Sequence, residues 1–156
     1  MKRVIIYIAA LAAAWFAPVD GANIGTLHPV EAVLIYKEET KVVLQTDTGD
    51  VGKGSNAEEA LEDLKKTTPG TIYLETAEYL LLGENTETVA EELRTHLKGN
   101  VGLCAAEEGV DPAEAARFLE VHGALPQLKD WKQGADLPYL TRVEKRLKLS
   151  KKALDK

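Results

Sequence analysis

The feature that most constrains the fold is the alternation of helical periodicity with short apolar runs rich in β-branched residues. Segments 55–69, 88–99 and 111–123 place apolar residues three and four positions apart, which is typical of amphipathic helices. The apolar runs typical of strands lie at 30–37, 40–46, 71–83 and 101–106. The predicted order is β-β-α-β-α-β-α. This order predicts an α/β fold with a mixed sheet. The sheet begins with a hairpin and continues through βαβ crossovers, and three helices cover it.

Capping residues indicate where each predicted helix begins. Ser55 with Glu58, and Thr88 with Glu91, have the spacing of a capping box. Asp111 precedes a proline, which is favoured at the first helical position. Each helical segment ends at a glycine, which is the usual stop signal. The sequence therefore predicts three short, well-delimited helices.

Two acids, Glu75 and Glu78, lie inside the apolar run 71–83 and raise the question of a catalytic pair. Acids three positions apart share one face of a helix but lie on opposite faces of a strand. The Ile, Tyr, Thr and Leu content of this run, after a Pro-Gly break, favours a strand. We therefore expect Glu75 and Glu78 to point apart, and we predict no acid and base pair here.

The first 21 residues have the layout of an export signal. Lys2 and Arg3 precede an unbroken apolar stretch at 4–19, which small and polar residues close. The stretch is shorter than the roughly 20 residues of a membrane span and longer than the about 7 to 15 residues of a signal core. A signal peptide cleaved after Gly21 and an uncleaved membrane anchor both stay open. In either case we expect an extracytoplasmic domain, secreted or anchored to the cell membrane.

Charge is divided unevenly along the chain. Residues 22–140, which we predict to be a single α/β domain, carry ten basic and 22 acidic side chains, a formal net charge of −12. Residues 141–156 form a basic C-terminal tail with seven basic and two acidic side chains. An acidic body argues against nucleic acid as a partner.

The basic tail fits two structures. Leu140, Val143, Leu147 and Leu154 fit the apolar face of a cationic helix, which would bind an anionic membrane surface. The sequence Arg-Leu-Lys-Leu-Ser at 146–150 also alternates as a strand does. Helix and strand both stay open for this segment.

Segment 46–50, Thr-Asp-Thr-Gly-Asp, contains the Asp-Thr-Gly tripeptide with which aspartic proteases present a catalytic carboxylate. Such a site needs two carboxylates that share one proton, supplied by a second loop or by a symmetric dimer. The three predicted helices disfavour the nearly all-β fold of that class, and Asp47 and Gly49 are typical turn residues. A secreted hydrolase that uses Asp47 remains the alternative function.

Segment 49–55, Gly-Asp-Val-Gly-Lys-Gly-Ser, is similar to a phosphate-binding loop but lacks its spacing. A phosphate-binding loop has four residues between its first glycine and Gly-Lys, with Ser or Thr directly after the lysine. Here two residues intervene, and Gly54 follows Lys53. We interpret the segment as a flexible loop that leads into a helix.

No catalytic, cofactor-binding or metal-binding residues are predicted elsewhere. Cys104, the only cysteine, lies among apolar residues and is expected to be a buried core residue. His28, His96 and His122 are scattered without the spacing of metal ligands. We interpret His96 and His122 as structural, because the C-terminus of a helix favours histidine.

Segment 52–97, from "GKGSNAEEALEDL" to "TVAEELRTHL", resembles the N-terminal domain of the C subunit of spore-germination receptors, the Ger(x)C family. Gly54, Glu59 and Ala60 occupy the places of that family's glycine-containing stretch and the helix after it. Residues 80–84 match the end of its hydrophobic strand, and "DPAEAARFLE" at 111–120 matches its small-residue helix. The resemblance covers 30–125. It implies a non-enzymatic, membrane-associated α/β module that acts by protein contacts in germinant sensing.

Two functions are therefore expected from the sequence. The first is an exported or membrane-anchored interaction module, without cofactor or catalytic site, that binds an envelope or membrane protein in spore germination or sporulation. The export signal, the acidic body and the resemblance favour this function. The second is the secreted hydrolase of the aspartic-protease type that uses Asp47.

Overall fold

The computed structural model describes residues 27–151, so the predicted signal or anchor at 1–21 and the last residues of the predicted basic tail, 152–156, lie outside the described residues. Seven strands form the main sheet: β2 (Ala32–Glu38), β3 (Lys41–Thr46), β4 (Val51–Gly54), β6 (Tyr79–Leu82), β7 (Gly102–Ala106), β8 (Tyr139–Val143) and β9 (Arg146–Ser150). The helices are α2 (Ala57–Thr67), α3 (Glu87–Leu93), which the 3-10 helix η3 (Arg94–His96) continues, and α4 (Pro112–His122). A small parallel sheet pairs β1 (Leu27–Pro29) with β5 (Thr71–Tyr73).

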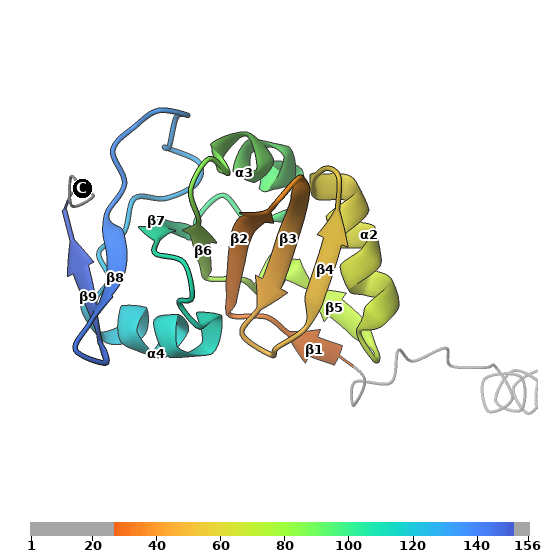
Figure 1. Ribbon diagram of the computed structural model, residues 1–156, viewed down its shortest axis with the longest axis horizontal. Helices are drawn as coiled ribbons and strands as arrows, with labels where there is room; N and C mark the ends of the chain where they lie inside the picture. Colours follow the sequence, from red (N-terminus) through yellow and green to blue (C-terminus); the bar gives the residue numbers. More distant parts are fainter. Residues whose placement is uncertain (1–26, 152–156) are drawn as a thin grey trace, which may run out of the picture.

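The main sheet is mixed, with the strand order β4-β3-β2-β6-β7-β8-β9 (Figure 1). β2, β6, β7 and β8 run parallel to their neighbours in this series. β3 and β4 add to one side as antiparallel strands, and β9 adds to the other side in the same way. The predicted α/β class, with a mixed sheet opened by a hairpin, is confirmed.

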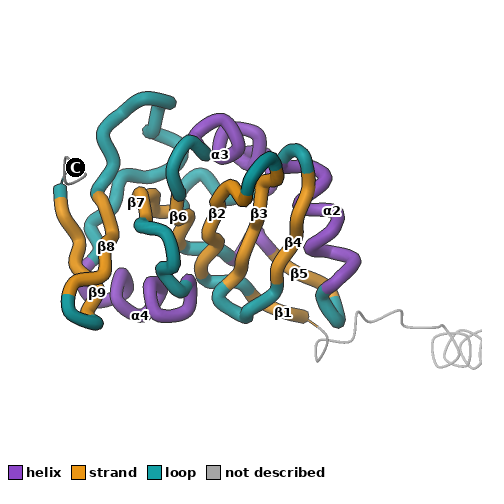
Figure 2. The backbone as a smooth tube through the Cα atoms, in the orientation of Figure 1, coloured by secondary structure: helices purple, strands orange, loops and turns teal. Residues whose placement is uncertain are grey.

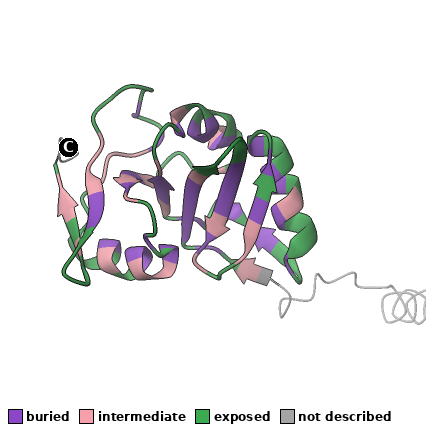
Figure 3. Cartoon of the chain, in the orientation of Figure 1, coloured by how far each residue is buried: buried purple, intermediate pink, exposed green. Residues whose placement is uncertain are grey.

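Helices cover both faces of the sheet, and the side chains of β2 point alternately to the two covered faces. Val33 and Ile35 belong to the core under α2 and α3, whereas Leu34 between them belongs to the core under α4. Successive side chains of a strand point to opposite faces, so β2 and its neighbours bury both faces. Buried residues accordingly concentrate in the central strands and on the inner faces of the helices (Figure 3).

The long connection 123–138 between α4 and β8 has no regular helix or strand (Figure 2). It is fixed along the beginning of β7, because the amide of Leu103 donates to the carbonyl of Pro126 at 2.8 Å. Leu128 and Trp131 then enter the core on the α2 and α3 side. The connection therefore completes a face of the sheet that helices leave partly open.

The segment that was predicted to be a loop, 49–55, contains an edge strand, so that interpretation is wrong for 51–54. β4 pairs with β3 in antiparallel register. A Cβ atom at Gly52 would lie 2.2 Å from the carbonyl oxygen of Ala60, and one at Gly54 would lie 2.3 Å from the amide nitrogen of Ala60. Gly52 and Gly54 are therefore needed for the direct packing of α2 on β4, and this packing accounts for both glycines without a phosphate-binding role.

The apolar run 71–83 is not one strand, as was predicted, but β5, a 3-10 turn η2 (Leu74–Thr76) and β6. Thr76 causes the break, since its hydroxyl accepts from the amide of Val30 at 2.9 Å and donates to the carbonyl of Tyr73 at 2.7 Å. These bonds replace a strand ladder and move the chain from the small sheet to the main sheet. Periodicity alone does not show such a break.

Two of the three predicted caps differ in the structure. Asn56, not Ser55, caps α2 by accepting from the amide of Glu59 at 2.9 Å. The predicted box of Thr88 is wrong because the N-cap of α3 is Thr86, two residues earlier, and Thr86 makes no side-chain capping bond. Asp111 caps α4 as predicted, accepting from the amide of Ala113 at 3.0 Å.

The basic segment 141–150 belongs to the main sheet, so the strand alternative holds for these residues and the helix does not. β8 and β9 form a hairpin whose turn places Glu144 and Lys145 at φ 47° and 68°. Leu147 and Leu149 pack against the core on the α4 side. The sheet therefore extends beyond the predicted domain boundary at 140, through Ser150.

Candidate binding site

At their carboxyl ends, the central parallel strands do not stop level with one another. β2 extends past the end of its parallel neighbour β6, and a crevice lies beyond the ends of β6 and β7. The pairing of β2 with β6 ends at Ile35↔Leu82, and the amide of Gly83 donates to the carbonyl of Ile35 at 2.8 Å. β2 continues to Glu38 beyond this point. A cavity of about 890 Å³ lies here, at the carboxyl ends of β6 and β7. Open α/β sheets commonly bind ligands at this edge.

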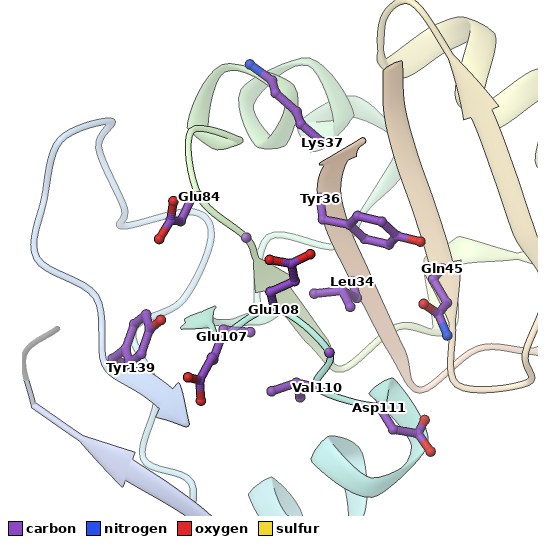
Figure 4. A pocket seen from close by; sticks show the side chains of 13 residues that line it. Leu34, Tyr36, Lys37, Gln45, Glu84, Glu107, Glu108, Val110, Asp111 and Tyr139 are labelled. Carbon is purple, nitrogen blue, oxygen red and sulfur yellow. The ribbon is translucent and has the colours of Figure 1, made fainter. Parts of the chain in front are cut away.

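Side chains from four strands and two loops line this crevice (Figure 4). Tyr36 and Gln45, from β2 and β3, lie on one side, and Tyr139, from β8, lies on the other. The turn after β6 and the loop 107–111 after β7 lie between them. Its apolar lining consists of Leu34, Ala106 and Val110. The crevice therefore combines apolar, aromatic and hydrogen-bonding groups.

Acidic side chains outnumber basic ones around the crevice. Glu84, Glu107, Glu108 and Asp111 line it together with a single lysine, Lys37. The ammonium group of Lys37 points away from the carboxylates of the 107–111 loop (Figure 4). The net charge of the lining is therefore negative, and a cationic group is the favoured occupant.

The hydroxyl of Tyr139 is subject to this negative potential. Burial raises its pKa, and the nearby charges of Glu107 and Glu84 raise the pKa further. Both causes act in the same direction because a phenolate would be an anion in a partly buried, acidic environment. Tyr139 is consequently a neutral phenol at physiological pH, able to donate and accept hydrogen bonds.

Two of the four carboxylates hold the fold together. Glu107 accepts from the hydroxyl of Thr141 at 2.5 Å and from the amide of Arg142 at 3.1 Å, which joins the end of β7 to β8. Asp111 caps α4. Glu84 and Glu108 are exposed, and they take part in none of the four ion pairs formed within 27–151. These two are therefore the carboxylates best placed to meet a ligand.

The carboxylates are spread around the crevice and do not converge on one point. Within the described part of the chain, no group of three or more His, Cys, Asp or Glu side chains is placed to hold a metal ion. The arrangement therefore suits an extended organic cation, whose charge is delocalised or repeated, better than a chelated metal.

Asp47 lies in the turn between β3 and β4. One oxygen of its carboxylate, Oδ1, accepts from the amides of Glu31 at 2.9 Å and Ala32 at 3.1 Å. These bonds fix the chain where it enters β2, as Asp often does in turns. The observed contacts thus give Asp47 a structural role.

Glu75 and Glu78 are both exposed, and they lie on different elements, η2 and the loop before β6. The prediction that Glu75 and Glu78 lie on opposite faces assumed one continuous strand over 71–83. That strand is not present. The backbone of Glu78 joins the start of β6 to the chain on both sides. Its amide donates to the carbonyl of Glu31, just before β2, at 2.8 Å, and its carbonyl accepts from the amide of Gly102, at the start of β7, at 2.8 Å. We find no hydrogen bond between their side chains among the described contacts.

Cys104 is fully buried in β7, as predicted, and burial raises the pKa of its thiol to about 12. His122 at the end of α4 stacks on Phe118, with ring centroids 4.2 Å apart, and its Nδ1 lies 2.9 Å from the carbonyl oxygen of Phe118. This contact agrees with a structural His122. His96 is exposed in η3.

Sequence analysis missed the residues of the crevice, namely Tyr36, Glu84, Glu108 and Tyr139. They form no motif, since they come from four separate segments. One signal was present: Glu84 and the run 107–111 come shortly after apolar strands, and the carboxyl ends of parallel strands meet at one edge of a sheet. The order of strands in the sheet, which brings Tyr36 and Tyr139 to the same edge, is not visible in the sequence.

Comparison of the chain with protein-family models, with curated proteins and with solved structures finds no match. Across residues 27–151, no helix has both the length and the apolar character needed to cross a membrane.

Proposed function

We propose that this chain is a non-enzymatic interaction module, exported or anchored to the cell membrane, that binds an envelope or membrane protein during spore germination or sporulation. The observation that carries the proposal is the crevice at the carboxyl ends of β6 and β7, with its exposed carboxylates and two tyrosines. It offers recognition chemistry at the edge of the sheet where α/β domains bind ligands.

The contacts of the carboxylates and of the thiol, the groups that a reaction would use, support a binding role. In the described contacts, Asp47, Glu107 and Asp111 direct their carboxylates to backbone amides. The thiol of Cys104 lies in the core. None of the hydrogen bonds found in 27–151 joins a Ser, Thr or Cys side chain to a histidine, which is the pairing that activates many nucleophiles.

Location and biological context rest on the sequence. The basic start and apolar stretch of 1–21 favour export, and the resemblance of 30–125 to the germination-receptor C subunit favours a role in the spore envelope. The β8–β9 hairpin and the residue after it carry Arg142, Lys145, Arg146, Lys148 and Lys151, so this end of the sheet is also suited to an anionic membrane surface.

The alternative, a hydrolase that uses Asp47, rests only on the Asp-Thr-Gly tripeptide. An aspartic dyad requires a second carboxylate in hydrogen-bond contact with the first, and the recorded partners of the Asp47 side chain in the described residues are two amides. The interaction module is therefore the function that the site supports best.

The test is a crosslinked pull-down of the tagged full chain from membranes of the organism that encodes it, taken during sporulation and during germination. We expect specific capture of germination-receptor subunits or other spore-envelope proteins. A correctly folded and correctly expressed chain that captures no envelope protein in either stage would refute the proposal.

A further inference from the structure

One side of the crevice includes an open position on a strand edge, at Lys37 of β2. Along a strand, backbone groups point alternately to its two sides. In β2, the carbonyl of Ala32 accepts from Asp47 on the β3 side, whereas that of Ile35 accepts from Gly83 on the β6 side. By this alternation, the N–H and C=O groups of Lys37 face the β6 side, where β6 has already ended.

No backbone hydrogen bond within the described residues joins Lys37 to the chain that follows β6. Lys37 is exposed and lines the crevice. An unpaired strand edge is a template for an added strand, and many domains bind extended peptides in this way. The open edge therefore points to an extended peptide as the occupant of the crevice.

The charge of the crevice selects the type of peptide. Glu84 and Glu108 are exposed on the loops opposite the open edge of β2. Guanidinium groups bind carboxylates through paired hydrogen bonds and stack on aromatic rings, and Tyr36 and Tyr139 supply such rings on the two sides. The lining therefore favours arginine, and secondarily lysine, over neutral or acidic side chains.

We infer that the crevice binds an extended, arginine- or lysine-bearing segment of the protein partner. The segment adds alongside Lys37 of β2, whose backbone groups are open, and directs its cationic side chains to Glu84 and Glu108. This inference rests on the proposed function, because it states the chemistry of the partner that the interaction module recognises.

The test uses fluorescence anisotropy with the full chain held in a non-ionic detergent. The probe is a fluorescein-labelled peptide of sequence Gly-Arg-Val-Arg-Val-Arg-Gly, and the control peptide carries glutamate in place of each arginine. Binding is measured at low ionic strength, about 0.05 M salt, and repeated at higher salt, because exposed ion pairs are screened. We expect the arginine peptide to bind, to bind more weakly as salt rises, and the glutamate peptide not to bind.

Two double variants locate the binding site. Glu84→Gln with Glu108→Gln removes the exposed crevice charges, and we expect about fivefold weaker binding, as the loss of two exposed ion pairs predicts. Glu62→Gln with Glu75→Gln makes the same change of charge at exposed positions outside the crevice lining. This control is expected to bind as the parent chain does. Circular dichroism confirms that both variants are folded.

A peptide with N-methyl groups at alternate residues separates strand addition from simple charge attraction, and it leaves the protein unchanged. We expect one of its two methylation registers to lose binding, because an added strand needs its amide protons. The inference is overturned if the arginine peptide does not bind up to about 1 mM, if both double variants weaken binding equally, or if neither methylated register changes it. Capture of the same envelope protein by the parent chain and by the crevice variant in the pull-down would overturn the crevice inference alone and retain the proposed function.

Discussion

Replacing Gly52 by alanine tests the packing that sets α2 against the sheet. A Cβ atom at this position would lie 2.2 Å from the carbonyl oxygen of Ala60 and 2.5 Å from both the Cβ and the amide nitrogen of Leu64. Two of these three neighbours are backbone atoms, so a change of rotamer does not relieve the clash. Since non-bonded carbon atoms prefer about 3.5 Å or more, α2 has to move away from β4 by about 1 Å.

The expected loss in the free energy of unfolding is the difference between the cost of the clash and the gain from a less flexible unfolded chain. Overpacking of a core contact costs about 1 to 3 kcal/mol, and the backbone contacts place Gly52→Ala at the upper end of that range. Alanine also reduces the entropy of the unfolded chain, which stabilises the folded state by about 0.4 to 1 kcal/mol where the backbone conformation is compatible. The net loss in the free energy of unfolding is therefore about 2 kcal/mol.

The assay is urea unfolding of the full chain, followed by circular dichroism. The matched control is Lys53→Ala, at the next position of the same strand, where the side chain is exposed and forms a surface ion pair with Glu38. Such pairs contribute little, so the control should keep nearly the parent midpoint. A Gly52→Ala chain as stable as the parent, or more stable, would show that α2 does not pack directly on β4.

Four further predictions follow from single contacts. Asp47→Ala should lower the free energy of unfolding by about 2 kcal/mol through the loss of two amide partners, while Asp47→Asn, which keeps an acceptor oxygen, should lose less in urea unfolding; equal losses would contradict the amide contacts. Cys104, with a thiol pKa raised to about 12 by burial, should react with a disulfide reagent at pH 8 on the order of a thousandfold more slowly in the native chain than in urea; similar rates would show an accessible thiol. Lys145→Gly should stabilise the β8–β9 hairpin by about 0.5 to 1 kcal/mol, because a left-handed residue without a side chain is not strained, and Lys145→Ala should give no such gain in thermal unfolding. The hydroxyl and the amide of Ser55 lower the pKa of Glu59, so its contribution to stability is present above the unfolded pKa and is lost as the pH falls through the folded pKa; Glu59→Gln should therefore be less stable than the parent at pH 7 and should converge with it in acid, whereas a difference that persists in acid would contradict this assignment.

The sequence was most informative where local chemistry and tertiary packing agree. The helix 57–67 and the helix 112–122 each combine apolar periodicity with a clear stop, and both were predicted to within two residues at each end. The hairpin of β2 and β3 was predicted for the same reason, since two β-branched runs flank a short polar turn. In these segments the hydrophobic pattern alone determines the element.

The errors arose where one side chain or one tertiary contact decides the outcome. Thr76 breaks an apolar run through bonds to Val30 and Tyr73, although the run has the composition of a continuous strand. Gly52 and Gly54 suggested a mobile loop, but they serve the close approach of a helix to an edge strand. Composition does not distinguish these uses of glycine, because both need a residue without a side chain.

The crevice was not predictable from the sequence for a topological reason. Tyr36 and Tyr139 are about a hundred residues apart in the chain, and they reach the same edge only because β6 and β7 insert between β2 and β8. Local patterns carry no information about that strand order. The acidic character of the body was visible in the sequence, but the position of Glu84 and Glu108 beside the crevice required the structure.

The central claim, that the chain acts by protein contact through the crevice, is tested most directly by photocrosslinking in the living cell. A photoreactive phenylalanine derivative replaces Glu84 in one strain and the exposed Glu62, outside the crevice lining, in another. The cells are irradiated during sporulation and germination, and the adducts are identified. The account predicts a defined adduct with one envelope protein from position 84 and none from position 62. No adduct from position 84, or the same adduct from both positions, would contradict it.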